Sequence, residues 1–238
     1  MTTLFDLQQV TVRYGQIHAL KCLDLRVLQG QRLALIGANG SGKSSLLRVL
    51  NGLVSKELSG QITVQKGVRQ AMLFQRPHML RMTVQSNVAM GLWFKGIPWA
   101  VAKTRALEAL ERVGLQAEAA RPAKALSLGQ QQRVAFARAL AQQPNVLLLD
   151  EPTASMDPHA KREVESLMHT FAGSQNEEAM TLIFASHNLG QVKRLATHVA
   201  YLEHGKLLAY LPVDDFFEAE KLRSISPAAD AFLKGETN

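Results

Sequence analysis

The stretch that decides the fold is QRLALIGANGSGKSS, residues 31–45. Its first half, residues 31–37, is apolar without alternation, which predicts a strand buried on both faces. Its second half fits the pattern of glycine, four residues, glycine, lysine and serine. A helical pattern follows over residues 43–52 and ends at a glycine. A strand, a glycine-rich loop and a helix in this order are the setting in which a P-loop binds phosphate groups.

Each residue type in this loop suits a phosphate ligand. Gly37, Gly40 and Gly42 let the backbone turn tightly and direct N–H groups at phosphate oxygens. Lys43 places a charge beside the outer phosphates, and Ser44 offers its hydroxyl to Mg²⁺. The other loop positions expected to line the nucleotide are Ala38, Asn39, Ser41 and Ser45. The alternative is a glycine-rich turn with a surface lysine, and the flanking strand and helix argue against it.

The composition fits a globular domain. The chain has 238 residues, of which 47% are hydrophobic and 20% charged, so it can bury a core. Its single cysteine, Cys22, allows no intrachain disulfide, which is compatible with a reducing cytoplasm. We expect no secretory signal at the N-terminus and no membrane-spanning run. The net charge of +7 is scattered along the chain, so we interpret it as a solvated basic surface and expect no nucleic-acid partner.

The rest of the pattern predicts an α/β fold. Strands are expected over residues 5–15, 22–30, 59–74 as a pair, 145–150, 179–187 and 198–210, and helices over 83–94, 98–114 and 158–171. Alternating strands and helices predict a mainly parallel core sheet with helices on both faces. We predict one domain over residues 1–210 with a helical subdomain inserted over about 83–141, and a short tail over 211–238.

A second motif, NVLLLDEP at residues 145–152, places acid at the end of an apolar strand. The carboxyl ends of parallel strands line the ligand crevice of such a sheet. Asp150 would there hold Mg²⁺ or its waters. Glu151 is a candidate general base for an attacking water. The alternative is a turn with two solvated acids.

Together with ALSLGQQQR at residues 125–133, these motifs resemble the ATP-binding subunit of an ABC transporter. The resemblance covers about Leu4 to Tyr210, and the motifs stand in the order of that family. They are Tyr14, residues 37–45, Gln75, Leu126 to Gln130, Asp150 and Glu151, Ser155 to Asp157, and His187. The resemblance implies an ATPase of the P-loop class with ATP and Mg²⁺ as cofactors. It also implies antiparallel strands near the N-terminus beside the parallel core sheet.

The resemblance also assigns roles to single residues. Tyr14 would stack on adenine, although a strand-end aromatic without a ligand is the plainer interpretation. Gln75 would contact Mg²⁺ and the attacking water and report the nucleotide state to a membrane partner. His187 would contact the γ-phosphate and orient the water or Glu151, and its alternative is a surface histidine. Asp157 would link two subunits.

Ser127, Leu128, Gly129 and Gln130 stand where a helix begins. A hydroxyl, backbone N–H groups and the helix dipole make such a place an anion site. In the family this motif closes over the γ-phosphate of ATP held by a second copy, in a head-to-tail dimer. The family usually has glycine where this chain has Leu128, whose Cβ limits backbone freedom and adds bulk. The plainer alternative is that Ser127 only caps the helix.

We therefore expect a cytoplasmic ATPase, peripheral on the inner face of the cell membrane, that drives an importer. Its partners would be a second copy of itself, a permease that docks near residues 75–94, and a substrate-binding protein. The stretch after Gln75 is similar to ATPases of bacterial oxyanion importers, tungstate above all, with phosphate and amino-acid importers as alternatives. The second class of function is a soluble ABC-type ATPase for assembly or repair, with no transporter. A non-catalytic module would be expected to lack Lys43 or Glu151.

Overall fold

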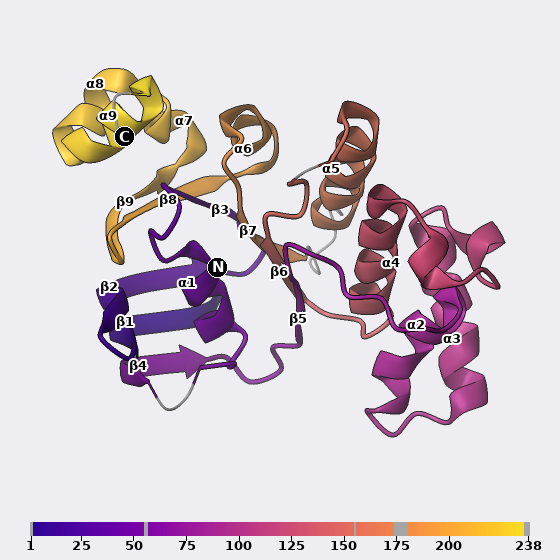
Figure 1. Ribbon diagram of the computed structural model, residues 1–238. Helices are drawn as coiled ribbons and strands as arrows, with labels where there is room; N and C mark the ends of the chain where they lie inside the picture. The colour runs from indigo at the N-terminus through magenta and orange to yellow at the C-terminus, as the bar shows by residue number, and fades with distance from the viewer. Residues whose placement is uncertain (1, 55–56, 155, 174–179, 236–238) are drawn as a thin grey trace.

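The computed structural model describes residues 2–54, 57–154, 156–173 and 180–235. Two sheets and a lobe of helices make up this part of the chain (Figure 1). In the described ranges, no helix combines the length and the apolar character that crossing a membrane requires.

The smaller sheet is formed by β1 (Thr3–Tyr14), β2 (Ile17–Leu28) and β4 (Leu58–Val64) in the order β2-β1-β4. Both pairings are antiparallel, and Phe5 lies opposite Val27 on one side and Val64 on the other. The first two strands turn at Gly15, whose φ of 59° favours glycine. The expected antiparallel strands near the N-terminus are therefore confirmed.

The larger sheet has the order β5-β6-β7-β3-β8-β9. Its strands are β5 (Gln70–Leu73), β6 (Val146–Asp150), β7 (Thr181–Ala185), β3 (Arg32–Ile36), β8 (His198–Glu203) and β9 (Lys206–Pro212). All pairings are parallel except that of β9, which returns antiparallel along β8. Every residue of β6 and β7 is buried, as apolar runs without alternation predict. The mainly parallel core sheet is confirmed.

Hydrophobic residues fill two cores, one on each face of this sheet. Successive residues of β3 point to opposite faces, so Leu33 and Leu35 lie in one core and Ala34 and Ile36 in the other. The first core joins α1 (Lys43–Leu50) and the antiparallel sheet. The second includes α5 (Pro158–Ala172) and α6 (Leu189–Leu195). Because both faces are covered, the loops that carry function lie at the strand ends.

The helical lobe holds α2 (Val84–Trp93), α3 (Trp99–Arg112), two 3₁₀ turns (Gln116–Glu118 and Ala123–Ala125) and α4 (Leu128–Leu140). The Thr83 hydroxyl caps α2 by accepting from the Ser86 N–H at 3.2 Å. Gly114, with φ 67°, follows the end of α3. The lobe stands at the right of Figure 1, and α4 is its helix nearest to α5. A helical subdomain is thus confirmed, while its limits at 83 and 141 stay a prediction.

The chain after β9 folds into α7 (Val213–Phe216), α8 (Ala219–Ile225) and α9 (Pro227–Lys234). Phe216 and Leu222 are fully buried, and the Phe232 and Tyr201 rings lie 5.2 Å apart. The sequence analysis predicted neither these three helices nor α6. Each of them has only four to eight residues, too few for a clear helical period.

Candidate nucleotide site

The predicted motifs meet at one edge of the core sheet. The P-loop follows β3, Gln75 follows β5, Glu151 follows β6 and His187 follows β7. These four strands are neighbours and run parallel, so their carboxyl ends lie side by side. Residues separated by more than a hundred positions in sequence are thereby brought into one crevice.

The P-loop backbone is built around glycine. Gly42 precedes α1 with φ 111°, and a Cβ at this position would lie 2.6 Å from the Ala19 carbonyl oxygen. Only glycine fits there, because β2 passes so closely. Gly40, with φ 78°, faces open space. The loop is therefore held from behind and open in front, as a phosphate cradle requires.

Lys43 is the buried cation of the loop. Its ammonium donates to the Gly37 carbonyl oxygen at 2.8 Å and the Ala38 carbonyl oxygen at 2.9 Å. Burial lowers the pKa of Lys43, and the charges of Glu151 and Asp150 oppose that shift. Carbonyl oxygens satisfy the charge only in part, so an anionic phosphate would be a stronger partner.

The other loop residues differ in exposure. Ala38 and Asn39 are exposed, and Ser45 is half-buried on the first turn of α1. The Ser41 hydroxyl is buried and has no hydrogen-bond partner among the residues that the structure describes. A buried polar atom of this kind calls for an explanation, and a bound nucleotide would supply one.

Two oxygen groups meet where Mg²⁺ is expected. The Ser44 hydroxyl donates to Asp150 Oδ1 at 2.9 Å. Burial raises the pKa of Asp150, while the hydrogen bond from Ser44 lowers it. Among the described residues no cluster of three or more histidine, cysteine or acidic residues forms a metal cage. One carboxylate and one hydroxyl beside a phosphate cradle nevertheless fit Mg²⁺, which prefers few protein ligands and phosphate oxygens.

Glu151 lies at the centre of a three-residue contact. His187 Nε2 lies 2.6 Å from Glu151 Oε1, and Gln75 Nε2 donates to Glu151 Oε2 at 3.1 Å. The Glu151 backbone has φ 47°, a region that costs a non-glycine residue about 1 kcal/mol or more. A cavity of about 470 Å³ borders Glu151 and His187. The strained backbone directs this carboxylate toward His187, which is the arrangement expected of a positioned base.

The stretch at Ser127 begins α4 as predicted. Ser127 Oγ accepts from the Gln130 N–H at 3.3 Å, and Gln130 Oε1 accepts from the Ser127 N–H at 3.0 Å, which completes a capping box. Leu128 is the first residue of α4 and is 43% exposed. Its backbone is helical, so it needs no glycine conformation here. Its effect on a phosphate ligand therefore reduces to the bulk of its side chain.

Gly129 has a packing role that sequence reasoning missed. A Cβ on Gly129 would lie 2.7 Å from the Ala160 Cβ, so glycine lets α4 and α5 approach closely. Asp157 caps α5 by accepting from the His159 N–H at 2.9 Å and the Ala160 N–H at 3.0 Å. The hydrogen bond from Ala160 is the main cause that lowers the Asp157 pKa. Ser155, in the same predicted motif, lies outside the described residues.

Tyr14 ends β1 and is 36% exposed, opposite Ile17 across the hairpin. The same hairpin reaches the P-loop where Ala19 contacts Gly42. Tyr14 therefore belongs to a hairpin that contacts the P-loop, and its stacking on adenine stays a prediction.

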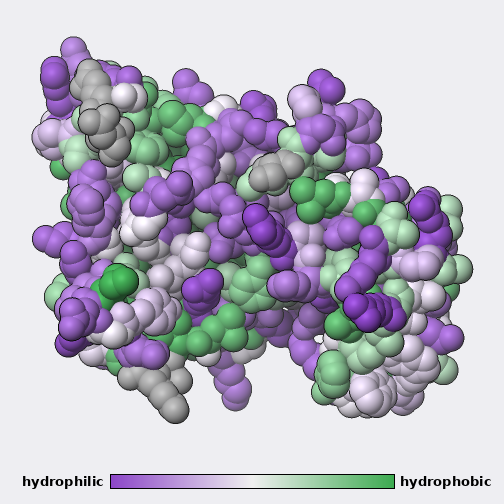
Figure 2. Space-filling view, in the orientation of Figure 1, coloured by the Kyte–Doolittle hydropathy of each residue, from purple (hydrophilic) through white to green (hydrophobic). Residues whose placement is uncertain are grey.

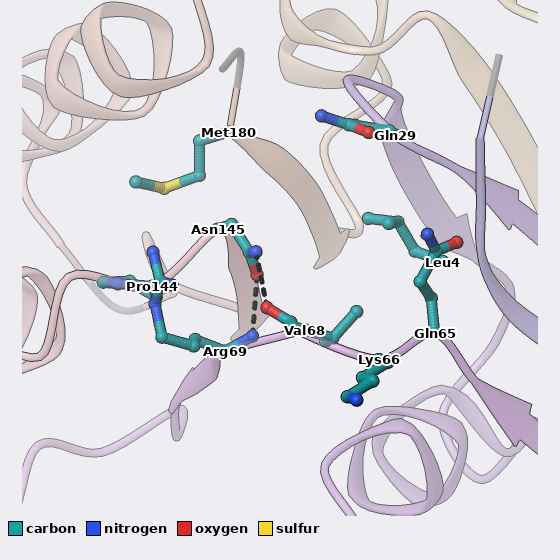
Figure 3. A pocket seen from close by; sticks show the side chains of 10 residues that line it. Leu4, Gln29, Gln65, Lys66, Val68, Arg69, Pro144, Asn145 and Met180 are labelled. Atoms are coloured by element: carbon teal, nitrogen blue, oxygen red, sulfur yellow. Dashed lines mark hydrogen bonds between the residues drawn. The ribbon is translucent and has the colours of Figure 1, made fainter.

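A separate cavity of about 360 Å³ lies at the opposite, amino-terminal ends of the core strands (Figure 3). Lys66 and Arg69 border it before β5, and Asn145 borders it before β6. Asn145 receives the Arg69 N–H at 2.8 Å and donates to the Gly67 carbonyl at 3.0 Å. None of the predicted nucleotide residues lines this cavity.

The fold and the site define a nucleotide-binding protein of the P-loop class. The sequence profile of the ABC transporter family matches residues 20–154, which is more than half of the chain. The chain therefore belongs to the ABC transporter family and is an ABC-type ATPase.

Three relatives cover most of the chain. It is 39% identical over 231 residues to the nickel import ATP-binding protein NikO of Rhodobacter capsulatus, covering 89% of this chain and 90% of that protein. It is 35% identical to the glutamine transport ATP-binding protein GlnQ of Geobacillus stearothermophilus, covering 90% and 92%. It is 32% identical to the phosphate import ATP-binding protein PstB 1 of Vibrio cholerae, covering 90% and 85%.

Solved structures have the same fold. CbiO1 of Clostridium perfringens, part of the ABC transporter complex cbiONQ, superposes with a TM-score of 0.80 at 26% identity over 98% of this chain and 100% of that one. A dimeric ATP-binding cassette bound to ADP and Pi superposes with a TM-score of 0.77 at 26% identity, covering 88% and 99%. The predicted ABC-type P-loop fold is thereby confirmed.

Proposed function

We propose that this chain is the ATP-binding and hydrolysing subunit of a bacterial importer, peripheral on the inner face of the membrane. The observation that carries the proposal is the meeting of Glu151 with Gln75 and His187 beside the P-loop. Relatives that match along most of the chain and are named for import or transport support the assignment to transport.

Each side chain of the site has its own role in ATP binding or hydrolysis. Lys43 binds the outer phosphates, and the P-loop N–H groups hold the rest of the phosphate chain. Ser44 and Asp150 would hold Mg²⁺, which would supply positive charge against the phosphates. Glu151 takes the proton of the attacking water, while Gln75 and His187 keep its carboxylate in place. Hydrolysis then rests on positioning and electrostatics.

Two copies of the chain complete the site. Ser127 and the N-terminus of α4 face the γ-phosphate bound by the other copy, in a head-to-tail dimer. Asp157 stands at the start of the helix that contacts α4 through Ala160, which suits a link between subunits. ATP favours the closed dimer only through its higher affinity for that state.

The permease docks against the segment after Gln75 and the helical lobe. Phe74, Arg76, Pro77 and Arg138 border a groove of about 310 Å³ at this place. Leu80, Trp93 and Phe94 are 46%, 50% and 77% exposed, so core packing accounts for them only in part. Figure 2 shows hydrophobic and weakly polar residues on the surface of the lobe at the right. Exposed apolar groups of this kind suit a protein partner.

For the cargo we propose an oxyanion such as tungstate, delivered by a substrate-binding protein. The relative named for phosphate import supports an oxyanion, since phosphate is one. Because other relatives are named for nickel and glutamine, the alternative cargoes are a metal ion and an amino acid.

The test is to purify the chain with the permease encoded beside its gene and to measure ATPase activity in lipid vesicles. Binding protein loaded with tungstate should stimulate hydrolysis, and parallel samples carry phosphate, glutamine or nickel. Stimulation by one of the other cargoes would replace the proposed substrate. A chain that binds no permease and hydrolyses ATP in solution would favour the assembly or repair class.

A further inference from the structure

A buried amide connects the two loops that carry the Glu151–His187 contact. Gln191 of α6 is fully buried. Its Oε1 accepts from the Ser186 hydroxyl at 2.6 Å, and its Nε2 donates to the Thr153 hydroxyl at 3.1 Å. Ser186 directly precedes His187, and Thr153 stands two residues after Glu151. One side chain therefore joins both loops immediately behind the site.

The same amide is fixed from a third side. Gln191 Nε2 also donates to Glu165 Oε1 of α5 at 3.2 Å. The other oxygen, Glu165 Oε2, accepts from Arg194 at 2.7 Å. The Asn188 side chain accepts from the Gln191 N–H at 2.9 Å, and the Asn188 N–H donates to Ser186 Oγ at 3.1 Å. Because all three hydrogen bonds of the Gln191 side chain are buried, the amide has little freedom to shift.

The pattern of donors and acceptors requires an amide. One end of the Gln191 side chain must accept from a hydroxyl, and the other must donate to a hydroxyl and to a carboxylate. An apolar residue would leave the Ser186 and Thr153 hydroxyls without this partner. A carboxylate would accept at one end, but its other oxygen would face Glu165, and two buried like charges disfavour each other.

We propose that Gln191 is a positioning residue for ATP hydrolysis. It holds the loop of Glu151 and the loop of His187 at one separation, so that the 2.6 Å contact between these two side chains is maintained. Its side chain is bonded to Ser186, Thr153 and Glu165, so it acts through the two loops. The inference rests on the proposed roles of Glu151 and His187, and it adds a residue to which sequence reasoning assigned no role.

The first test compares two buried glutamines in the full chain. Gln191→Met keeps the length of the side chain and removes its hydrogen bonds. Gln31→Met is the matched control, because Gln31 is also buried and accepts from the Leu28 N–H and the Tyr210 hydroxyl, but stands at the amino end of β3. Gln191→Met should lower kcat about tenfold or more, since positioning governs such steps, with KM for ATP nearly unchanged. Gln31→Met should keep kcat within about twofold. An equal loss of kcat in both variants, or none in Gln191→Met, overturns the proposal.

A second variant adds a readout that depends on pH and is taken where its chain remains folded. Gln191→Glu is nearly isosteric, and its new carboxyl would face Glu165 of α5. The other charged groups nearby are Arg194, on α6 like Gln191, and the Glu151–His187 pair beyond the two loops. The variant should hydrolyse ATP slowly when this carboxyl is charged and faster when it is protonated, because a protonated carboxyl can donate a hydrogen bond again. The ratio of its kcat to the wild-type value should therefore rise as the pH falls from 8.5 to 6. A flat ratio contradicts the proposal.

A final experiment distinguishes the positioning role of Gln191 from the assignment of Glu151 as the base. Glu151→Gln alone should nearly abolish single-turnover hydrolysis, and adding Gln191→Met should then cause no further loss, because the residue acts through Glu151. A loss in Glu151→Gln with full activity in Gln191→Met refutes only the positioning role. Near-normal hydrolysis by Glu151→Gln refutes the base assignment and this inference with it.

Discussion

Two helix beginnings in this molecule have similar chemistry and different surroundings. At the start of α1, Gly42 is pressed against β2, Lys43 is buried, and Ser44 is bonded to an acid on a neighbouring strand. At the start of α4, Ser127 is exposed, and its hydroxyl and N–H are both bonded to Gln130, three residues on. The first is assembled from three strands of the same chain. The second is a local capping box, and we propose that a second copy of the chain completes it.

Substitutions at the start of α1 and at the start of α4 should therefore have different kinds of effect. A substitution near α1 should already weaken ATP binding by a single chain, because the residues that hold the P-loop are in that chain. A lesion at α4 should leave the folded monomer intact and act only when two copies meet.

Glu151→Gln should leave Mg·ATP binding intact and lower turnover by about 10²–10⁴-fold, the usual contribution of a positioned base. The amide keeps the shape of the carboxylate but cannot accept the proton. Isothermal calorimetry gives the affinity, and phosphate release gives the rate. Glu108→Gln, at an exposed position of α3, is the control and should behave as wild type. Near-normal turnover by the purified Glu151→Gln variant would remove Glu151 from the mechanism.

Ser127→Asp and Ser127→Ala should separate capping from phosphate binding. Aspartate is as good a helix cap as serine, whereas alanine loses about 1 kcal/mol of stability. Aspartate, however, places a negative charge opposite the γ-phosphate. We therefore expect Ser127→Asp to unfold like wild type in urea but to lose ATP-dependent dimerisation by about tenfold or more. Normal dimerisation by Ser127→Asp would show that this residue is a cap alone.

Leu128→Gly should tighten dimerisation slightly, by roughly threefold, because it removes bulk at the mouth of α4. Since the backbone of Leu128 is already helical, bulk is the only feature that glycine would relieve. Leu128→Ala should then act as well as glycine and at less cost to the helix. Sedimentation in the Glu151→Gln background measures both. Weaker dimerisation in both variants would mean that the leucine contacts the other copy favourably.

Local sequence was sufficient for the elements and motifs that depend on their own residues. The apolar run of β6 predicted a buried strand, and the glycine pattern at 37–42 predicted the loop before α1. Contacts between distant segments could not be predicted in this way. Gly129 packs on Ala160, and Gln191 joins loops that follow different strands, only after the sheet has brought them together. The positive φ of Glu151 and the tail helices likewise depend on tertiary packing.

The most direct measurement is nucleotide trapping in a mixed dimer. One chain carries Lys43→Ala and the other Ser127→Arg, both with Glu151→Gln to stall hydrolysis, and two affinity tags verify the pairing. Ser127→Phe is run beside Ser127→Arg, because the arginine charge could attract phosphate. If Ser127 serves the other copy, both lesions fall in one site, and the second site stays whole. The account predicts about one ATP trapped per mixed dimer. No trapped ATP in verified mixed dimers would contradict it and would mean that each chain builds its own site.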